Sequence, residues 1–508
     1  MTSQRPEVLI ERTLSGARRR SGRVRGSVLG AALLSLLTIA GCGGGGGGGG
    51  GGPAPVPPPT ILNINNATDP SSPVGLAVEI NGDAFIASTT VRFTRGMNVA
   101  TVTPDADAIQ YASVLVVVPG GGNMGAFTVP GDVTVEVLTS EGTSNARTLA
   151  LVPTVTFDVN NVTWGTTNSL PTALRGHVAA AVPRDGMDPL LFVAGGNDGT
   201  NHQTAVQASS IAGDGSVAAF STTTALPAAR AYAGVAVAHA GNAPVLEENA
   251  HVYVLGGQAD PMDTPGGAAT AYVGSVSLTL GTITQWTETT ALPEPLIGPA
   301  TATFNGFLYV AGGLRSDGTP SAAVYSAAIG SDGELGPWSR SPNDLPAALS
   351  FGRLFGFAGR LYMIGGDPSS STDPTDQTGV GVKSVFIARA QRGGVEPWGS
   401  DAGMVKQRKK HHVWAAFGQL IAVGGVYNGS PGSQELERST IQGDGSLSSW
   451  NSITSSSNQI NANTFNAAIV VSPRLTMNDK PRLLLIGGET FTGSTGTLSS
   501  TIHVNTAP

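Results

Sequence analysis

A short apolar run that ends in two glycines occurs six times after residue 154, and this repeat constrains the fold more than any other feature of the chain. The first copy is Leu191-Phe192-Val193-Ala194 followed by two glycines. Successive copies lie 53 to 63 residues apart, which indicates strands of constant length joined by loops of variable length. The paired glycines are Gly195 and Gly196, Gly256 and Gly257, Gly312 and Gly313, Gly365 and Gly366, Gly424 and Gly425, and Gly487 and Gly488.

Each repeat has the features of one blade of a β-propeller. A strand that is apolar on both faces has to lie between other sheets, as the inner strands of a blade do. Two glycines at its end permit positive φ angles and a close approach of backbones. Six such repeats predict a six-bladed propeller over residues 154–508.

A large aromatic residue recurs in phase with the glycine pairs. It is Phe220 in one repeat, and a glycine stands five residues before every copy except the first. Three of these glycines follow aspartate, as in Asp214-Gly215, which is a hairpin-turn signal. We therefore expect a third strand to turn at this glycine into a fourth strand that carries the ring. The other copies of the aromatic residue are Trp164, Trp286, Trp338, Trp398 and Trp450.

The two ends of the repeat region are incomplete in complementary ways. Trp164 has Val159 where the other copies have glycine, so no hairpin precedes it. After the last glycine pair only one more strand is expected, from Thr497 to Val504. The strand around Trp164 is therefore predicted to pair beside His503 and complete the last blade, which closes the ring and removes exposed sheet edges.

The glycine pair, the aromatic residue and the period together resemble the kelch repeats of the central domain of galactose oxidase and related proteins. The resemblance covers residues 154–505 and implies four-stranded blades in a ring. This chain departs from the family pattern in detail, because tyrosine precedes the glycines only at Tyr253, Tyr309 and Tyr362. Some kelch-like propellers are enzymes, so the resemblance leaves the function open.

Residues 60–153 predict a separate all-β domain. Asp132-Val133-Thr134-Val135-Glu136-Val137 alternates strictly between polar and apolar positions, and Asn81-Gly82 is a strong turn signal. Several such short strands favour an immunoglobulin-like sandwich. The segments from Ile80 to Phe85 and from Gly131 to Val135 resemble IPT/TIG domains, which implies a spacer or an adhesion module.

Residues 1–41 have the form of a signal peptide. Seven arginines lie within residues 1–25, and the apolar run from Val28 to Ala40 is too short to span a membrane comfortably. The following Ile39-Ala40-Gly41-Cys42 resembles the bacterial lipobox, which implies lipid attachment at Cys42 after cleavage. The alternative is an ordinary signal peptide that happens to contain a cysteine.

Residues 42–59 are a run of glycines and then prolines, which predicts a flexible linker. The lipobox resemblance implies an extracytoplasmic protein held at a membrane by its lipid anchor. Because Gly43 rather than aspartate follows the cysteine, the outer membrane is expected, on its periplasmic face or at the cell surface.

Several chemistries are excluded or disfavoured. The only cysteine is Cys42, so no intramolecular disulfide, no cysteine-rich zinc site and no tyrosine–cysteine copper site can form. The net charge of −7 argues against a nucleic-acid partner. A glycine five rather than three residues before the tryptophan differs from the Asp-boxes of sialidases. We predict no cofactor and no metal site, but a sugar-epimerase-like activity is harder to exclude, because no motif carries its acid–base residues.

Three arginines are the candidate ligand-binding residues. Arg175, Arg230 and Arg408 are expected near the starts of first strands, which line the channel, so they could converge on an anion. The alternative is that they bind loop carbonyls or carboxylates of the blades. Arg408 also opens the basic run Arg408-Lys409-Lys410-His411-His412, which we interpret as a solvated loop rather than a polyanion or metal patch; its two adjacent histidines would face opposite ways.

The sequence therefore favours a binding or adhesion protein of the cell envelope over an enzyme. The expected partner is a protein or a glycan that contacts the propeller loops, of which the longest run from Gly257 to Tyr272 and from Gly366 to Val382. The alternative is a carbohydrate-active enzyme, similar to a sugar epimerase, with its site in the channel. Carboxylates in the channel would favour that alternative.

Overall fold

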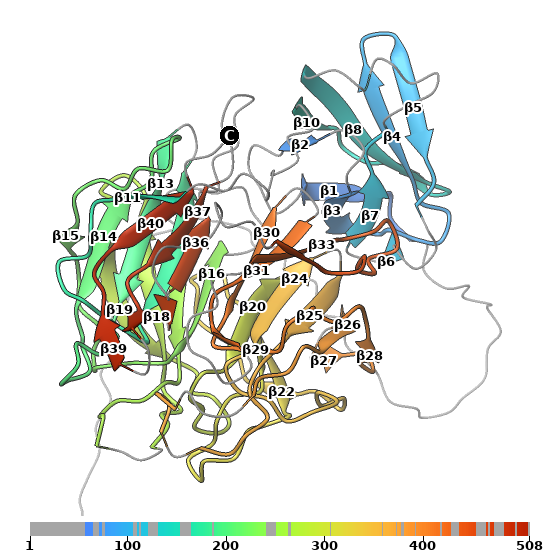
Figure 1. Ribbon diagram of the computed structural model, residues 1–508. Coiled ribbons are helices and arrows are strands. Elements are labelled where there is room, and N and C mark those ends of the chain that lie inside the picture. Colours follow the sequence, from blue (N-terminus) through green and yellow to red (C-terminus); the bar gives the residue numbers. More distant parts are fainter. Residues whose placement is uncertain are drawn as a thin grey trace, which may run out of the picture. The chain divides into compact units, whose positions relative to one another are not determined.

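A computed structural model describes most of residues 56–505, and these residues form β-strands and no α-helix (Figure 1). The signal peptide, Cys42 and most of the linker lie outside the described residues. No described segment is a helix long and apolar enough to cross a membrane. The gaps in the described range are 65–70, 74–76, 105–108, 111–112, 120–126, 128–130, 153–163, 185–186, 240–249, 263–265, 305, 358, 372, 377–379, 392, 417–418, 428–435, 454–463, 466–467, 472–481 and 493–494.

The first part of the described chain contains two sheets that share one core. The alternation of Asp132 to Val137 lies on β8, where Val133, Val135 and Val137 are buried. They join Val78 and Phe93 from the two sheets in a single apolar cluster, so the sheets pack face to face. One sheet is β1 (Thr60–Ile64), β3 (Ala77–Asp83), β7 (Ser113–Val117) and β6 (Ile109–Gln110); the other is β2 (Ser71–Pro73), β10 (Arg147–Val152), β8 (Gly131–Thr139), β4 (Thr90–Arg95) and β5 (Asn98–Val102), with β9 (Gly142–Thr143) beside β8.

Eight further antiparallel sheets follow in the described residues. Two are small, namely β29 (Arg408–Lys409) with β32 (Val426–Tyr427), and β35 (Thr464–Phe465) with β38 (Glu489–Thr492) and β39 (Thr495–Leu498); the other six we number as blades 1 to 6 in chain order. Blade 1 is β12 (Val178–Arg184), β13 (Met187–Ala194), β14 (Val206–Ser210) and β15 (Ser221–Thr222); blade 2 is β16 (Gly234–His239), β17 (Ala250–Leu255), β18 (Ala271–Ser277) and β19 (Thr282–Thr289); blade 3 is β20 (Ala300–Phe304), β21 (Phe307–Ala311), β22 (Val324–Ala328) and β23 (Ser339–Arg340). Blade 4 is β24 (Arg353–Phe357), β25 (Arg360–Ile364) and β26 (Val385–Gln391), with β27 (Gly394–Val395) and β28 (Gly399–Ser400) both paired to β26; blade 5 is β30 (His412–Ala416), β31 (Gln419–Val423), β33 (Leu436–Thr440) and β34 (Asn451–Ile453); blade 6 is β36 (Ala468–Val471), β37 (Leu483–Ile486), β40 (Ile502–Asn505) and β11 (Trp164–Thr167).

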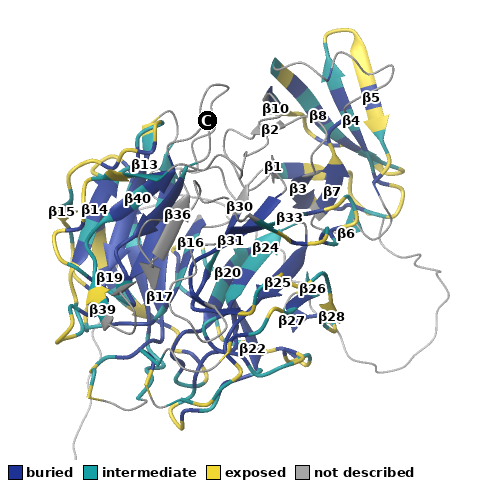
Figure 2. Cartoon of the chain, in the orientation of Figure 1, coloured by how far each residue is buried: buried dark blue, intermediate teal, exposed yellow. Residues whose placement is uncertain are grey.

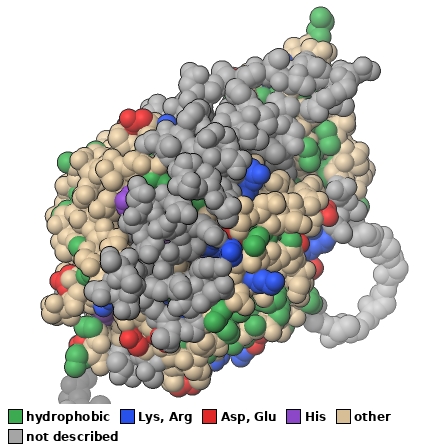
Figure 3. Space-filling view, in the orientation of Figure 1, with side chains coloured by type: hydrophobic (Ala, Val, Ile, Leu, Met, Phe, Trp, Pro, Cys, Tyr) green, Lys and Arg blue, Asp and Glu red, His purple; other side chains and the backbone are tan. Residues whose placement is uncertain are grey.

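The six sheets form the ring of a β-propeller. The innermost strands of blades 1 to 4 contact one another in order, β36 of blade 6 contacts the inner strand of blade 1, and it also contacts that of blade 5. The second strands β17, β25, β31 and β37 are buried along their whole length, and β13 and β21 are less buried only where they begin (Figure 2). On the face that Figure 3 shows, charged side chains of both signs are scattered over a mostly uncharged surface, which agrees with the 12% share of charged residues.

The first repeat strand completes the last blade. β11 pairs antiparallel with β40, with Trp164 opposite Asn505 and Thr166 opposite His503, as the missing fourth strand of the last repeat predicts. The expected single strand from Thr497 to Val504 is wrong in its extent. Its first half belongs to β39 (Thr495–Leu498), which turns back onto β38 (Glu489–Thr492), and only its second half reaches blade 6 as β40.

The paired glycines fasten each blade to the next. All twelve have positive φ angles, from 55° to 125°. A side chain at Gly195 would overlap the backbone oxygen of Arg230 at the entry to blade 2, while the N–H of Gly196 donates to that same oxygen at 2.7 Å. Gly313 donates in the same way to Leu349 at the entry to blade 4. The repeated motif is therefore a joint between blades as well as the end of a strand.

The recurring aromatic residues form a second set of joints. The indole N–H of Trp286 donates to the backbone oxygen of Thr224 in the preceding blade at 2.9 Å, and Trp338 donates likewise to Thr290 at 3.0 Å. Trp450 repeats the bond with the oxygen of Ala402. These three tryptophans are thus placed by a hydrogen bond to the neighbouring blade, whereas the indole N–H groups of Trp164 and Trp398 are buried without a partner among the described residues.

The tyrosines that precede three glycine pairs form hydrogen bonds with the following blade instead. The Tyr253 and Tyr362 hydroxyls each donate at 2.7 Å to the backbone oxygen of the turn glycine in the next blade, Gly333 and Gly445. Tyr309 makes the equivalent bond to Gln391 at 3.1 Å. Burial raises the pKa of all three phenols, so they act as hydrogen-bond donors at physiological pH.

Tyr362→Phe is expected to lower the free energy of unfolding by about 1–2 kcal/mol, because it leaves the buried oxygen of Gly445 without its donor. Tyr309→Phe, whose bond is longer and less buried, should cost less. Urea unfolding followed by tryptophan fluorescence measures both. Equal losses of unfolding free energy in the two variants would show that the tyrosine hydrogen bonds to the following blade do not join the blades.

Candidate functional site

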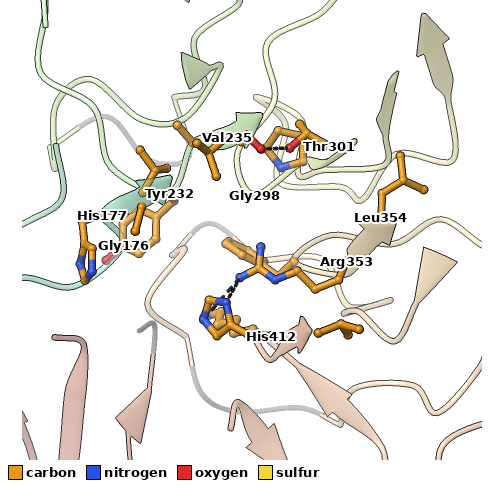
Figure 4. Close-up of a pocket in the computed structure, with 17 residues that line it drawn as sticks. Gly176, His177, Tyr232, Val235, Gly298, Thr301, Arg353, Leu354 and His412 are labelled. Carbon is orange, nitrogen blue, oxygen red and sulfur yellow. Dashed lines mark hydrogen bonds between the residues drawn. The ribbon is translucent and has the colours of Figure 1, made fainter. Parts of the chain in front are cut away.

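A cavity of about 200 Å³ lies inside the ring of inner strands, at the end where these strands begin (Figure 4). Blades 1 to 5 each contribute residues to its lining. The apolar part of the lining includes Val178, Val235, Leu354 and Val413. The titratable lining residues that the structure describes are His177, Tyr232, Arg353, Lys410 and His412, and none is a carboxylate.

Five residues form a hydrogen-bonded collar around the mouth of this cavity. The N–H of each of the last four donates to the backbone oxygen of the collar residue in the preceding blade, at distances of 2.7, 2.8, 2.9 and 3.1 Å around the ring. All five have φ angles between 51° and 60°. The same spacing before β36 points to Asn466, which lies outside the described residues. The collar residues are Gly176, Tyr232, Gly298, Phe351 and Lys410.

The collar is strained at three of its positions. Tyr232, Phe351 and Lys410 adopt a left-handed backbone that residues with side chains rarely take. Two packing contacts offset this cost, because the Tyr232 ring covers Gly176 and the Phe351 ring covers Gly298 so closely that neither glycine has room for a side chain. The two rings also meet edge to face at 6.5 Å. Strained positions that tertiary packing enforces are typical of functional sites.

Below the collar, Arg353 and His412 face one another in the cavity (Figure 4). The guanidinium of Arg353 donates through Nε to the backbone oxygen of His411 at 2.7 Å, and its Nη2 lies 3.0 Å from Nδ1 of His412. Burial lowers the pKa of Arg353 to about 10, which leaves it charged at neutral pH. Burial, followed by the charge of Arg353, holds the pKa of His412 well below its usual range, so the imidazole is neutral.

The basic run is buried, so its interpretation as a solvated loop is wrong. The side chains of Arg408 and Glu437 are both completely buried and form an ion pair at 2.9 Å. Lys409 pairs with Asp367 at 2.6 Å, and the ammonium of Lys410 lies 4.9 Å above the Phe351 ring. Each cation has a partner that lies far from it in the sequence, and the interaction with this partner offsets the desolvation cost of burying the charge.

The two histidines of the run have different surroundings, as their adjacency predicts. His411 is fully buried against Gly365 and Gly425, while His412 lines the cavity. Burial also lowers the pKa of His177, a third lining histidine, to about 4. Within the described residues, no three His, Cys, Asp or Glu side chains gather as metal ligands do.

The structure does not bring the three predicted arginines together. Arg408 is used within blade 5, where it also donates to the oxygen of Gly424. Arg230 is buried, stacks 5.1 Å from the centre of the Tyr272 ring and contacts Thr270. Arg175 pairs with Glu489 at 3.2 Å. None of the three is among the residues that line the cavity, and each has a partner within the protein, as in the alternative of loop carbonyls or carboxylates.

Sequence reasoning missed Arg353, although a signal for it exists. In blades 3, 4 and 5 the residue twelve positions before the first glycine of the pair begins the inner strand, and these residues are Ala300, Arg353 and His412. Aligning the repeats at this position places the arginine and the histidine side by side at the channel.

The strand pairing and the lined channel together define the class of the protein as a six-bladed β-propeller with a cavity on its axis. The chain is similar to a solved structure described as "Structure of YjhT", at 14% sequence identity and a TM-score of 0.45, over 66% of this chain and 96% of that chain. No protein-family model matches the sequence, and no curated protein matches it.

Lys410 makes the stability of the collar depend on pH. Burial, and then the charge of Lys409, lower the pKa of Lys410 from 10.5 to about 7. Between these values the unfolded chain binds more protons than the folded chain, so the free energy of unfolding should rise with pH, by about 1 kcal/mol per pH unit at most. Urea unfolding between pH 7.5 and 9.5 measures this slope. Lys410→Met should flatten it, and an equal slope in both proteins would contradict the assignment.

Proposed function

We propose that the protein is a lipid-anchored, extracytoplasmic binding protein that captures a protein or glycan of the cell envelope through the loops at the collar end of its propeller. In this proposal the propeller is of the kelch type, the domain of residues 60–153 is an IPT/TIG-like, immunoglobulin-like spacer, and Cys42 carries the anchor in the outer membrane. The observation that carries it is the common position of the long loops, because every glycine pair ends its strand at the collar end.

Aspartate side chains give these loops fixed shapes. Asp198 accepts hydrogen bonds from the backbone N–H groups of Thr200 and Asn201 at 2.9 and 2.7 Å. Asp317 does the same for Thr319, and Asp260 for Met262. Loops that are ordered before a partner arrives lose less conformational entropy on binding, which supports a role in recognition.

The described lining of the channel supports binding rather than acid–base catalysis. A sugar epimerase needs a group that takes a proton from carbon and another that returns one, and the pKa of such a base lies near the working pH. The cavity offers a charged Arg353 and a neutral His412 held far below its usual pKa, with no carboxylate among its described residues. The pKa of Lys410, which also lines the cavity, lies near 7, but its ammonium donates to the backbone oxygens of Pro374 and Asp376.

Two exposed apolar residues of blade 2 provide a matched test. Met262 lies 84% exposed on the collar-end loop, and Leu280 lies 73% exposed at the turn on the opposite end. The full-length protein, Met262→Ser and Leu280→Ser are each used as bait for envelope proteins and on a glycan array. We expect Met262→Ser to reduce capture of the specific partner about tenfold and Leu280→Ser to leave it unchanged. Equal capture by all three proteins, or no specific capture by the unaltered protein, would overturn the proposal.

The anchor is tested separately. Cys42→Ser should move the protein from the membrane fraction to the soluble extracytoplasmic fraction, because the substitution removes the thiol that takes the lipid. Fractionation and mass spectrometry of the N-terminus measure this. An unchanged membrane fraction with no lipid on Cys42 would contradict the anchored arrangement.

A further inference from the structure

Arg353, which is half-buried, differs from Arg408 and Arg175 in what surrounds its charge. Arg408 is paired with Glu437, and Arg175 is paired with Glu489. Arg353 has no carboxylate partner among the described residues, and burial is the one cause that shifts its pKa. Its neighbours are an uncharged backbone oxygen and the neutral imidazole of His412.

A cation that is partly withdrawn from water without a counter-charge has a desolvation cost. The guanidinium has five N–H donors, and only those of Nε and Nη2 meet His411 and His412. The remaining donors belong to a side chain that lines the cavity (Figure 4). The cavity therefore holds an uncompensated positive charge with donors to spare.

The second polar group at this point is also a donor. A guanidinium has no acceptor, so the His412 nitrogen that faces it must be unprotonated, and the neutral ring carries its proton on the other nitrogen. The hydroxyl of Thr301 is already used, because it donates to the backbone oxygen of Val235 at 2.6 Å. Apolar side chains, including Leu354 and Val413, form the walls around these donors.

We propose that this cavity binds the carboxylate of a small organic acid, with Arg353 holding the carboxylate oxygens through paired N–H donors and His412 setting the orientation of the guanidinium. The site lies in the channel and is independent of the loop surface proposed above. A forked guanidinium matches the planar carboxylate group in geometry.

Charge and size select within the class of anions. Arg353 brings one positive charge with free donors, whereas the ammonium of Lys410, the other lining cation, donates to the backbone oxygens of Pro374 and Asp376. A monoanion therefore matches the charge of Arg353, whereas a dianion such as phosphate or sulfate carries a second negative charge that this guanidinium does not match. The volume of about 200 Å³ is smaller than typical pockets for drug-sized ligands, so it suits an acid of a few carbon atoms.

The first test uses the unaltered full-length protein. Phenylglyoxal modifies accessible arginines, and peptide mass spectrometry reports each site. We expect acetate, propionate and pyruvate to slow modification of Arg353 at least about threefold, and to leave Arg340, an exposed arginine on β23, unaffected. Acetamide, which has the same shape as acetate without its charge, should give no protection. No protection by any of the three acids would overturn the proposal.

The second test compares variants by thermal unfolding at pH 7.5 and constant ionic strength. Acetate and pyruvate should raise the Tm of the unaltered protein and of Arg340→Gln, and this rise should be lost in Arg353→Gln and reduced in Arg353→Lys, which keeps the charge but not the fork. An equal rise in all four proteins would show a nonspecific salt effect and overturn the site. Stronger stabilisation by phosphate or sulfate than by acetate would overturn the choice of a monoanionic carboxylate. If Arg353→Gln does not fold, protection of Arg353 in the unaltered protein decides.

Discussion

Replacing Glu437 with leucine is expected to lower the free energy of unfolding by about 3–5 kcal/mol, one of the two largest effects of a single substitution in this propeller. The substitution leaves the guanidinium of Arg408 without a counter-charge in a position that is completely buried. It also removes the acceptor for the N–H of Val405, which donates to the Glu437 carboxylate at 2.6 Å. Urea unfolding of the single variant against the unaltered protein measures the loss.

A double variant separates the lost ion pair from lost packing. Arg408→Met combined with Glu437→Leu removes both charges and keeps much of the buried volume, so its loss of stability should be smaller than that of Glu437→Leu alone. Arg408→Met alone completes the comparison. If the loss of unfolding free energy in the double variant equals the sum of the losses in the two single variants, the two residues are not coupled. Such additivity would contradict the account of the basic run given above.

Gly298→Ala at the collar is expected to lower the free energy of unfolding by about 3 kcal/mol or more. Its φ of 57° is unfavourable for alanine, which costs about 1–2 kcal/mol, and the added methyl group would overlap the ring of Phe351. Displacing that ring would also disturb its contact with the ammonium of Lys410. Thermal and urea unfolding give the measurement.

Gly306 provides the matched control, because its φ is 75° but no atom lies within 4 Å of the position a side chain would take. Gly306→Ala should therefore show only the backbone cost, about 1–2 kcal/mol. The difference between the two variants isolates the overlap with Phe351. If the two substitutions cost the same, the collar is not closely packed.

The ring itself was predictable from sequence because the repeats carry local signals. The glycine pairs need a backbone that other residues rarely adopt, and their period counts the blades directly. The pairing of β11 with β40 followed from the strand that the last repeat lacks. The boundary of β40 was not predictable, because the hairpin of β38 and β39 draws Thr497 away from blade 6.

The site was predicted poorly because its character depends on contacts between residues that are far apart in the sequence. The partners of the basic run, Glu437 and Asp367, lie 29 and 42 residues away from the cations they neutralise, so the local sequence indicates a solvated loop. The collar shows the same limit. Gly176 and Gly298 suit a left-handed backbone, but nothing in Tyr232 or Phe351 signals one.

Cross-linking of β11 to β40 tests the closed ring most directly. Thr166 and His503 lie opposite each other and both have solvent-accessible side chains, so Thr166→Cys combined with His503→Cys should form a disulfide on mild oxidation of the full-length protein. Thr166→Cys combined with Thr222→Cys, on the outer strand of blade 1, is the control and should not. Mass spectrometry should recover the peptides of positions 166 and 503 joined within one monomer. Failure to link them, or linking only between molecules, would contradict a propeller closed by its first strand.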